Sequence, residues 1–309
     1  MAQTLRIGTR GSQLALKQTN MVAERLRAAH PSLDIAVVEI LTSGDWKPSQ
    51  GETRLMEAKG GKGQFAHEIE QRILAGEIDC GVHSLKDMPS FLPDGLEIVH
   101  FLEREDPRDV FLSAKYKDFA EMPAGAVIGT SSLRRQAFIL NKFPHLNVVP
   151  LRGNVATRIE KLHQGQVDAT FLALAGLNRL GLTSYVTRTL PVEEFLPACG
   201  QGIIGIEIRT GDTATAALFD AISCPVTARI ATAERAVLQI LDGSCHTPVG
   251  AYATIADNHI TLRCAVAKPD GTFYTEDQIT GPVTTVADAH HLGEELGRRI
   301  KPTLPDGIL

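Results

Sequence analysis

The chain has 309 residues, and its formal net charge of −5 argues against the broad basic surface of a nucleic-acid-binding protein. Hydrophobic residues make up 43% of it, but no apolar run is long enough to span a bilayer, which argues against a membrane protein. Because this length exceeds what one hydrophobic core usually supports, we expect two or three domains.

The N-terminal part of the chain predicts strands that alternate with helices. In chain order we expect a strand at 4–9, a helix from Ser12 to about residue 30, a strand at 35–41, a helix at 65–74 and a strand at 78–82. The first strand begins almost at once, without the pattern of a signal peptide, so we expect a cytoplasmic protein. Residues 43–60 are polar and rich in glycine, and they form a candidate lid.

The middle of the chain repeats this pattern. We expect strands at 126–128, 147–150 and 169–172, a helix from Leu133 and another at 155–164, and a strand at 203–208 that returns to the first sheet. Such alternation predicts parallel sheets with helices on both faces, the α/β class. The charged run 103–109 is typical of a solvated crossover between domains, and a hinge is the alternative.

The C-terminal part follows a different pattern and predicts a smaller α+β domain. We expect a helix at 228–241, strands at 249–255, 259–266 and 272–279, and a final helix at 286–300. Between the first of these helices and the first strand lies a short loop that contains Cys245.

Two turns, one in each α/β half, are candidate anion sites. Each runs from a strand through Gly-Thr and Ser into a helix, so that free N–H groups and the positive end of the helix dipole meet there. Arginine, which pairs with carboxylates in a bidentate manner, stands at or near such strand ends or helix starts at positions Arg10, Arg134, Arg135, Arg152, Arg158 and Arg179. The alternative is a scatter of solvated arginines on the surface.

Asp87 and Cys245 are the candidate reactive side chains. Asp87 follows a buried strand at the mouth of the expected cleft, where it would stabilise a cation or move a proton. A structural ion pair with an arginine is the alternative. Cys245 lies in a loop where a thiol is reachable, whereas a buried packing role is commoner for cysteine. The five cysteines include no close pair, so we expect neither a disulfide framework nor a metal site.

With these segments identified, the chain resembles the porphobilinogen deaminase family, also called hydroxymethylbilane synthases, over essentially its whole length. The motifs occur in the family's order: Thr9-Arg10 with Ser12, Gly61-Lys62-Gly63, His83-Ser84 with Lys86-Asp87, Glu105-Asp106-Pro107-Arg108-Asp109, Gly129 to Arg135, Leu151-Arg152-Gly153-Asn154, Gly200-Gln201-Gly202 and the Cys245 loop. No single motif is decisive, but their common order leaves little room for chance.

This resemblance implies a fold with two domains like type II periplasmic binding proteins and a smaller α+β domain. The expected boundaries are 1–103 with 201–222, then 104–200, then 223–309. It also implies a dipyrromethane cofactor bound through a thioether to Cys245. The family condenses four porphobilinogen units head to tail with loss of ammonia and releases hydroxymethylbilane, a step of tetrapyrrole biosynthesis. We expect a monomer whose partner is the small-molecule substrate.

The same resemblance assigns roles to individual residues. Asp87 is the implied catalytic acid, which would stabilise the cation that remains on the substrate when ammonia leaves. The implied carboxylate-binding arginines are the six named above, and supporting positions are Ser12, Lys86, Ser132 and Gly153. Each pyrrole carries an acetate and a propionate, so a cofactor with its growing chain is a polyanion that several arginines can hold.

The chain departs from the usual family pattern at three positions. Gly11 stands where glutamine is common, Ser244 replaces a glycine, and Lys59 lies one place later than a lysine often seen in the lid. None of these removes a predicted reactive group. The alternative function is a non-catalytic binding module for a small anion, which would need neither Asp87 nor Cys245.

Overall fold

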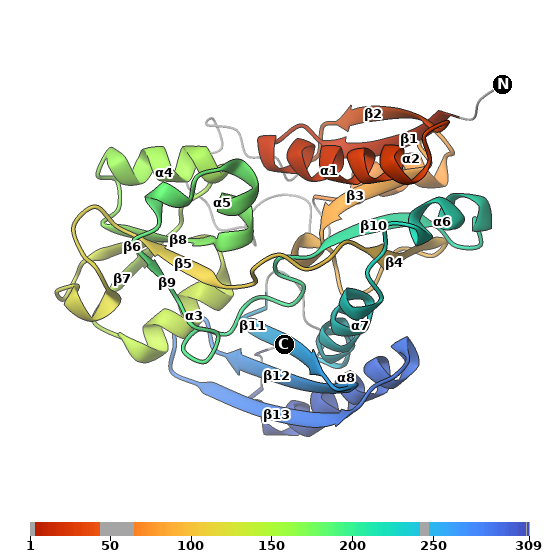
Figure 1. The fold of residues 1–309 in the computed structure, drawn as a ribbon. Coiled ribbons are helices and arrows are strands. Elements are labelled where there is room, and N and C mark those ends of the chain that lie inside the picture. Colours follow the sequence, from red (N-terminus) through yellow and green to blue (C-terminus); the bar gives the residue numbers. More distant parts are fainter. Residues whose placement is uncertain (1–3, 44–64, 242–246, 307, 309) are drawn as a thin grey trace.

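The computed structural model describes residues 4–43, 65–241, 247–306 and 308, and three sheets organise them. Figure 1 shows two α/β units side by side and the third unit, coloured blue, packed below both. Nearly all of the candidate lid, together with Cys245, lies outside the described residues. Within the described ranges, no helix has the length and apolar character that crossing a membrane requires.

The first sheet has the strand order β2-β1-β3-β10-β4. Its strands are β1 (Thr4–Arg10), β2 (Asp34–Ile40), β3 (Cys80–Ser84), β4 (Leu96–Phe101) and β10 (Ile204–Arg209). The first three strands are parallel, whereas β10 pairs antiparallel with both β3 and β4. The prediction that residues 203–208 return to the first sheet is therefore confirmed.

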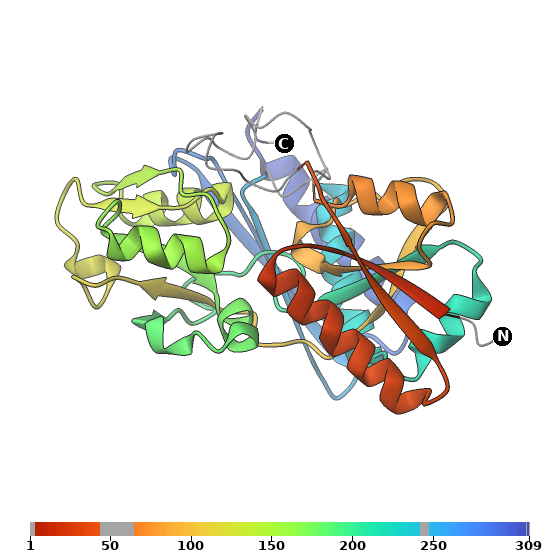
Figure 2. The same cartoon turned by 90° about the horizontal axis from the view of Figure 1, so that it is seen from above.

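Helices cover both faces of this sheet, as Figure 2 shows from above. The helices are α1 (Gln13–Ala29), α2 (His67–Leu74) and α6 (Thr213–Asp220). Val22 and Leu26 of α1 share one apolar cluster with Phe219 of α6 and Ile7 of β1. Ile69 and Ile73 of α2 belong to a separate cluster, which includes Ile40. The two clusters bury opposite sets of side chains of the alternating strands.

The second sheet has the order β7-β6-β8-β5-β9, which repeats the arrangement of the first. Its elements are β5 (Asp109–Leu112), β6 (Val127–Gly129), β7 (Asn147–Val149), β8 (Ala169–Ala173) and β9 (Arg188–Thr189), with helices α3 (Leu133–Lys142), α4 (Val155–His163) and α5 (Leu174–Leu180). Strand β5 runs antiparallel to β8. The expectation of purely parallel sheets is therefore wrong, because a strand that crosses over from the other unit enters each sheet antiparallel.

The third sheet, β11-β12-β13, is antiparallel. It comprises β11 (Val249–Ala256), β12 (His259–Ala267) and β13 (Tyr274–Pro282), against which α7 (Pro225–Ile240) and α8 (Val286–Ile300) pack. Short 3₁₀ turns complete the fold: η3 (Leu85–Asp87), η4 (Phe119–Glu121), η5 (Thr183–Tyr185) and η6 (Lys301–Thr303). The predicted class, two α/β units and a smaller α+β unit, is confirmed; the exact domain boundaries stay a prediction.

The charged run 103–109 is not the solvated crossover that its composition suggested. Asp109 is fully buried at the start of β5, and the side chain of Arg104 is 10% exposed. Both Arg104 Nη atoms donate to the carboxylate of the fully buried Glu234 of α7, one of them at 2.6 Å. Glu234 also accepts the N–H of Gly200, at 2.7 Å. One carboxylate of the third unit therefore binds both segments that connect the two α/β units, at Arg104 and at Gly200. The hinge alternative stays a prediction.

Candidate functional site

The site begins where β3 ends. Leu85 is 1% exposed, and its N–H donates to the carbonyl of Ile203 at 3.0 Å, which fixes the chain against the return crossover. The next two residues, Lys86 and Asp87, complete η3 and are half-buried. This places a cation and a carboxylate at the carboxyl end of a strand, where open α/β sheets bind ligands.

Gln201 connects this strand end to the second unit. Its Oε1 accepts a hydrogen bond from Lys86 Nζ at 3.4 Å, and its Nε2 donates to Pro107 O at 2.6 Å and to Asp109 Oδ1 at 3.1 Å. Burial, reinforced by the nearby arginines Arg134 and Arg135, lowers the pKa of Lys86 to about 8. The Asp87 and Asp109 carboxylates oppose this shift, so Lys86 remains a cation at neutral pH.

Arg134 and Arg135 lie in the first turn of α3 and are buried around one carboxylate. Arg134 Nη2 donates to Asp109 Oδ2 at 2.6 Å, and Arg135 Nη2 donates to Asp109 Oδ1 at 2.7 Å. Each arginine also donates to a carbonyl, Arg134 to Leu196 and Arg135 to Phe171. Burial alone would raise the pKa of Asp109, but the two guanidinium groups outweigh it and lower that pKa.

This cluster carries a net positive charge, because two arginines share one carboxylate. Arg134 Nε is buried and has no hydrogen-bond partner within the described residues. The same holds for the hydroxyl of Ser131, which precedes α3 and is 7% exposed. Unpartnered buried donors are costly, so their presence favours a site that an anion completes.

Arg179 lies at the junction of the first two units. Its Nη2 donates to Gly202 O at 2.7 Å, while its Nε is buried without a partner in the described chain. Burial lowers the pKa of Arg179 to about 10, and Glu105 opposes the shift. A hollow of about 570 Å³ opens beside it, lined also by Lys17 of α1 and Gly181.

The turn after β1 holds Arg10 and Ser12 as predicted. Ser12 Oγ accepts the N–H of Ala15 at 3.3 Å and so caps α1. The guanidinium of Arg10 stacks over the ring of Phe65, 4.3 Å from its centroid. The end of β1 is therefore in contact with the residue before α2 at which the described chain resumes.

The corresponding turn of the second unit is formed by Ser132, which accepts the Arg135 N–H at 3.4 Å and caps α3. The turn before α4 carries Arg152 and Gly153, and Arg158 lies near the start of α4 itself. Arg158 Nε donates to Gly153 O at 2.8 Å, and Gly153 adopts φ +113°, a conformation that favours glycine. Arg152 is 5% exposed.

The structure thus joins Lys86, Arg134 and Arg135 through two residues that the sequence analysis did not single out, Asp109 and Gln201. Both belong to motifs that carried the family resemblance, so a signal was present. Their roles could not be read from it, because each depends on partners far away in the chain.

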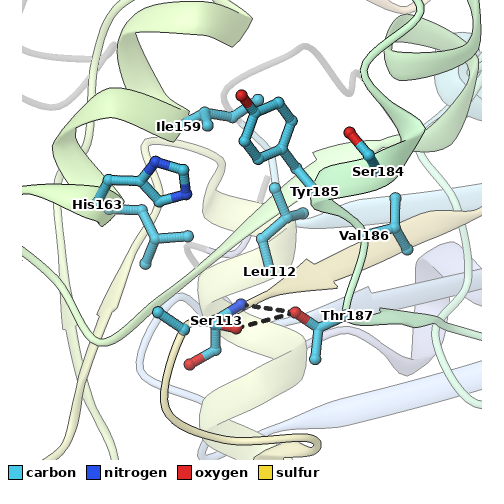
Figure 3. A pocket seen from close by; sticks show the side chains of 10 residues that line it. Leu112, Ser113, Ile159, His163, Ser184, Tyr185, Val186 and Thr187 are labelled. Atoms are coloured by element: carbon cyan, nitrogen blue, oxygen red, sulfur yellow. Dashed lines mark hydrogen bonds between the residues drawn. The ribbon is translucent and has the colours of Figure 1, made fainter.

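A pocket of the second unit lies away from these residues. It has a volume of about 220 Å³, and its lining includes Leu112, His163 and Tyr185 (Figure 3). Ser113 and Thr187 exchange hydrogen bonds at one side of it, both at 3.0 Å. None of the predicted site residues lines this pocket, so we assign the chemistry to the strand ends and not to this hollow.

The cysteines that the structure describes supply no reactive group to the site. Cys80, Cys199 and Cys264 are buried, and burial raises the pKa of the Cys199 thiol to about 12. Among the described residues, no group of three His, Cys, Asp or Glu side chains is arranged to hold a metal ion.

Comparison with known proteins identifies the family. A family model described as "Porphobilinogen deaminase, dipyromethane cofactor binding domain" matches residues 5–217, and one described as "Porphobilinogen deaminase, C-terminal domain" matches residues 228–302. Porphobilinogen deaminase of Thiobacillus denitrificans is 45% identical, with 96% of this chain and 95% of the relative covered. That of Nitrobacter winogradskyi is 48% identical, with 96% and 92% covered.

Among solved structures, a nutrient-binding protein from Burkholderia cenocepacia bound to methionine is similar with a TM-score of 0.45 and 12% identity, covering 72% of this chain and 92% of that one. The family models and the curated relatives span nearly the whole sequence, including both crossovers and the α+β unit. The chain therefore belongs to the porphobilinogen deaminase family.

Proposed function

We propose that this protein condenses porphobilinogen units, with loss of ammonia, within the site at the strand ends of the two α/β units, and that Asp87 is its catalytic carboxylate. Membership of the family supplies the reaction, the deamination of porphobilinogen in tetrapyrrole biosynthesis as hydroxymethylbilane synthase. The observation that carries the assignment of the site is the buried cluster in which Asp109 leaves one positive charge of Arg134 and Arg135 uncompensated.

The described residues fit the dipyrromethane cofactor of the family. It bears several carboxylates, and the donors that would meet them are Arg134 Nε, Ser131 Oγ and Arg179 Nε, all buried without partners in the described chain. When bound, the cofactor would supply the free pyrrole carbon to which the first substrate is joined. We propose attachment through a thioether at Cys245, in the loop that follows α7.

Arg10, Arg152 and Arg158 are proposed to hold further carboxylates of the substrate and of the growing chain. Arg10 ends β1, Arg152 precedes α4 and Arg158 lies near the start of α4, so all three lie close to a strand end or a helix start, where backbone N–H groups add to the positive potential. Ser12 and Ser132 cap the adjoining helices, and Gly153 permits the turn that presents Arg152. Lys86 adds a cation next to Asp87.

The proposed role of Asp87 is to stabilise positive charge on the substrate. When ammonia leaves the substrate, positive charge develops on the pyrrole, and a fixed carboxylate stabilises that charge more strongly in a partly buried site than in water. The arginines meanwhile bind the carboxylates at the periphery of the ligand. Asp87 thus faces the positive charge on the pyrrole, and the Arg side chains face the negative charges.

The replacement Asp87→Asn tests this role because it keeps the shape of the side chain and removes its charge. We expect folded protein with its cofactor attached and a kcat lower by about 100-fold or more, the usual size of such an electrostatic contribution. Near-normal turnover would reject the role of Asp87. Intact mass measured on the same sample separates loss of chemistry from loss of the cofactor.

We further propose that the protein works as a cytoplasmic monomer, on its membership of the family. Size-exclusion chromatography with light scattering tests the oligomeric state. A stable dimer at micromolar concentration would contradict it.

A further inference from the structure

Two side chains of α7 reach out of the third unit and hold the loop that follows Asp87. Arg235 Nη2 donates to Pro89 O at 2.9 Å and to Ser90 O at 3.3 Å. Gln239 Nε2 donates to the same Ser90 carbonyl at 3.0 Å. Residues 235 and 239 are four apart, so they lie on one face of the helix.

The Arg235 guanidinium is used here in an unusual way. Within the described part of the chain no carboxylate forms an ion pair with it, and its hydrogen bonds go to carbonyl oxygens of another unit. Burial lowers its pKa, which shows that the surroundings disfavour the charge. A partly buried cation that serves only to dock a backbone segment indicates that the position of this segment matters.

The chain between Asp87 and these carbonyls is short and stiff. Met88 is 3% exposed and has φ −83° and ψ +142°, the extended conformation that a following proline favours. Pro89 has its own φ locked by the ring. A shift of the carbonyls at 89 and 90 is therefore transmitted toward Asp87, because the burial of Met88 and the ring of Pro89 restrict rotation between them.

Asp87 is thus held from two sides. Before it, the Leu85 N–H bonds to Ile203 O in the return crossover of the first unit. After it, α7 of the third unit holds Pro89 and Ser90. The same helix leads in the sequence to the loop with Cys245, the proposed site of cofactor attachment.

We infer that Arg235 and Gln239 are positioning residues, which hold Asp87 in place at the end of β3. They touch neither substrate nor cofactor in this account and act through the backbone of residues 88–90. The inference rests on the proposed role of Asp87. It adds that the unit bearing the cofactor cysteine also aligns the carboxylate that works on the substrate.

Arg235→Met and Gln239→Met remove these contacts, and Arg229→Met is the matched control. Arg229 lies on the same helix and also donates to a carbonyl, that of Val283 at 3.2 Å, but within the third unit. We expect R235M to lower kcat by about 10- to 100-fold with KM nearly unchanged, since a displacement of the order of 1 Å costs up to about 100-fold. Q239M should cost less, and R235K should restore part of the rate because lysine still donates to carbonyls.

A double-mutant cycle that combines R235M with Asp87→Asn distinguishes an effect of Arg235 on the position of Asp87 from a general effect on protein stability. If Arg235 acts through Asp87, R235M costs little in the D87N background, whereas an independent effect would cost the same in both. Intact mass, taken for each variant, must show the cofactor attached. If R235M does not fold, Q239M carries the same comparison.

Each outcome bears on a different claim. A kcat for R235M and Q239M equal to that of R229M, or an equal loss with and without the Asp87 carboxylate, overturns the positioning role. Near-normal turnover of D87N alone contradicts the proposed function instead. A slow D87N together with normal R235M and Q239M rejects the inference and leaves the proposed function intact.

Discussion

Asp109 and Arg134 form a hydrogen-bonded ion pair of 2.6 Å between side chains that are 0% and 4% exposed. The pair joins the start of β5 to the first turn of α3, and Arg135 shares the same carboxylate. The arginines that the sequence assigns to ligand carboxylates therefore already hold one carboxylate of the protein. This internal anion allows two adjacent guanidinium groups to be buried side by side before any ligand is present.

Replacing Asp109 by Asn should destabilise the protein strongly. The change leaves two buried guanidinium groups without their counter-charge, and breaking a buried pair typically costs about 3 to 5 kcal/mol. Urea unfolding measures the loss. Asp106→Asn is the control, because its bond to Arg108 is partly exposed and such pairs contribute about 0 to 1 kcal/mol. Equal stabilities of D109N and D106N would show that the buried cluster is not a main source of stability.

Arg135→Leu should weaken both stability and ligand capture. Asp109 would keep Arg134 but lose the bonds from Arg135 Nε and Nη2, and the Phe171 carbonyl would lose its donor. We expect a lower melting temperature together with a smaller fraction of chains that carry the cofactor, measured by intact mass. A lower melting temperature with full cofactor occupancy would make Arg135 a purely structural residue.

Glu70 makes the stability depend on pH. It is 4% exposed, and burial, with the nearby Glu207 and Glu68 carboxylates, raises its pKa to about 7 although His83 opposes the shift. The folded state therefore binds more protons than the unfolded state between about pH 4.5 and 7, so this contribution is present at low pH and is lost as the pH rises through 7. The full effect is on the order of 3 kcal/mol.

The replacement Glu70→Gln stays neutral and should remove that fall. Urea unfolding at pH 5 and at pH 8 gives the free energy of unfolding of the wild type, of E70Q and of Glu77→Gln, a control at an exposed position. We expect E77Q to follow the wild type and E70Q to lose less stability at pH 8. A parallel fall in all three proteins would mean that Glu70 titrates normally.

Gly153→Ala tests the turn that presents Arg152 and Arg158. A Cβ at this position would lie 2.7 Å from Thr157 Cγ2, and φ +113° is strained for any other residue, at a cost of about 1 to 3 kcal/mol. Gly165→Ala is the control, because it has a positive φ but no neighbour within 4 Å. We expect G153A to lose substrate affinity, seen as a raised KM, and G165A to keep it. Equal KM values for G153A and G165A would show that the turn at Gly153 does not contribute to substrate binding.

The sequence predicted most of the regular structure, for identifiable reasons. Ser12 and Ser132 mark helix starts because their hydroxyls accept backbone N–H groups, and the long amphipathic helices bury one face. It missed β4, β5, β9, α5 and α6, none of which is longer than 8 residues, so none carries a clear period. The antiparallel return of β10 depends on the tertiary path and not on a local pattern.

The site was predictable in part. The positions of Asp87 and the arginines at strand ends follow from topology, since such ends line the ligand-binding edge. The burial of Asp109 could not be foreseen, because in a charged run a carboxylate resembles a solvated one until its partners at 134 and 135 are brought beside it. The contacts of Gln201 and Arg235 depend likewise on residues remote in sequence.

The central claim is that a covalently anchored oligopyrrole lies in this arginine-rich site, and intact mass under denaturing conditions tests it most directly. We expect the purified protein to carry the additional mass of two pyrrole units, and Cys245→Ser to lack it while Cys199→Ser keeps it. An active preparation whose chains have the unmodified mass would contradict the account.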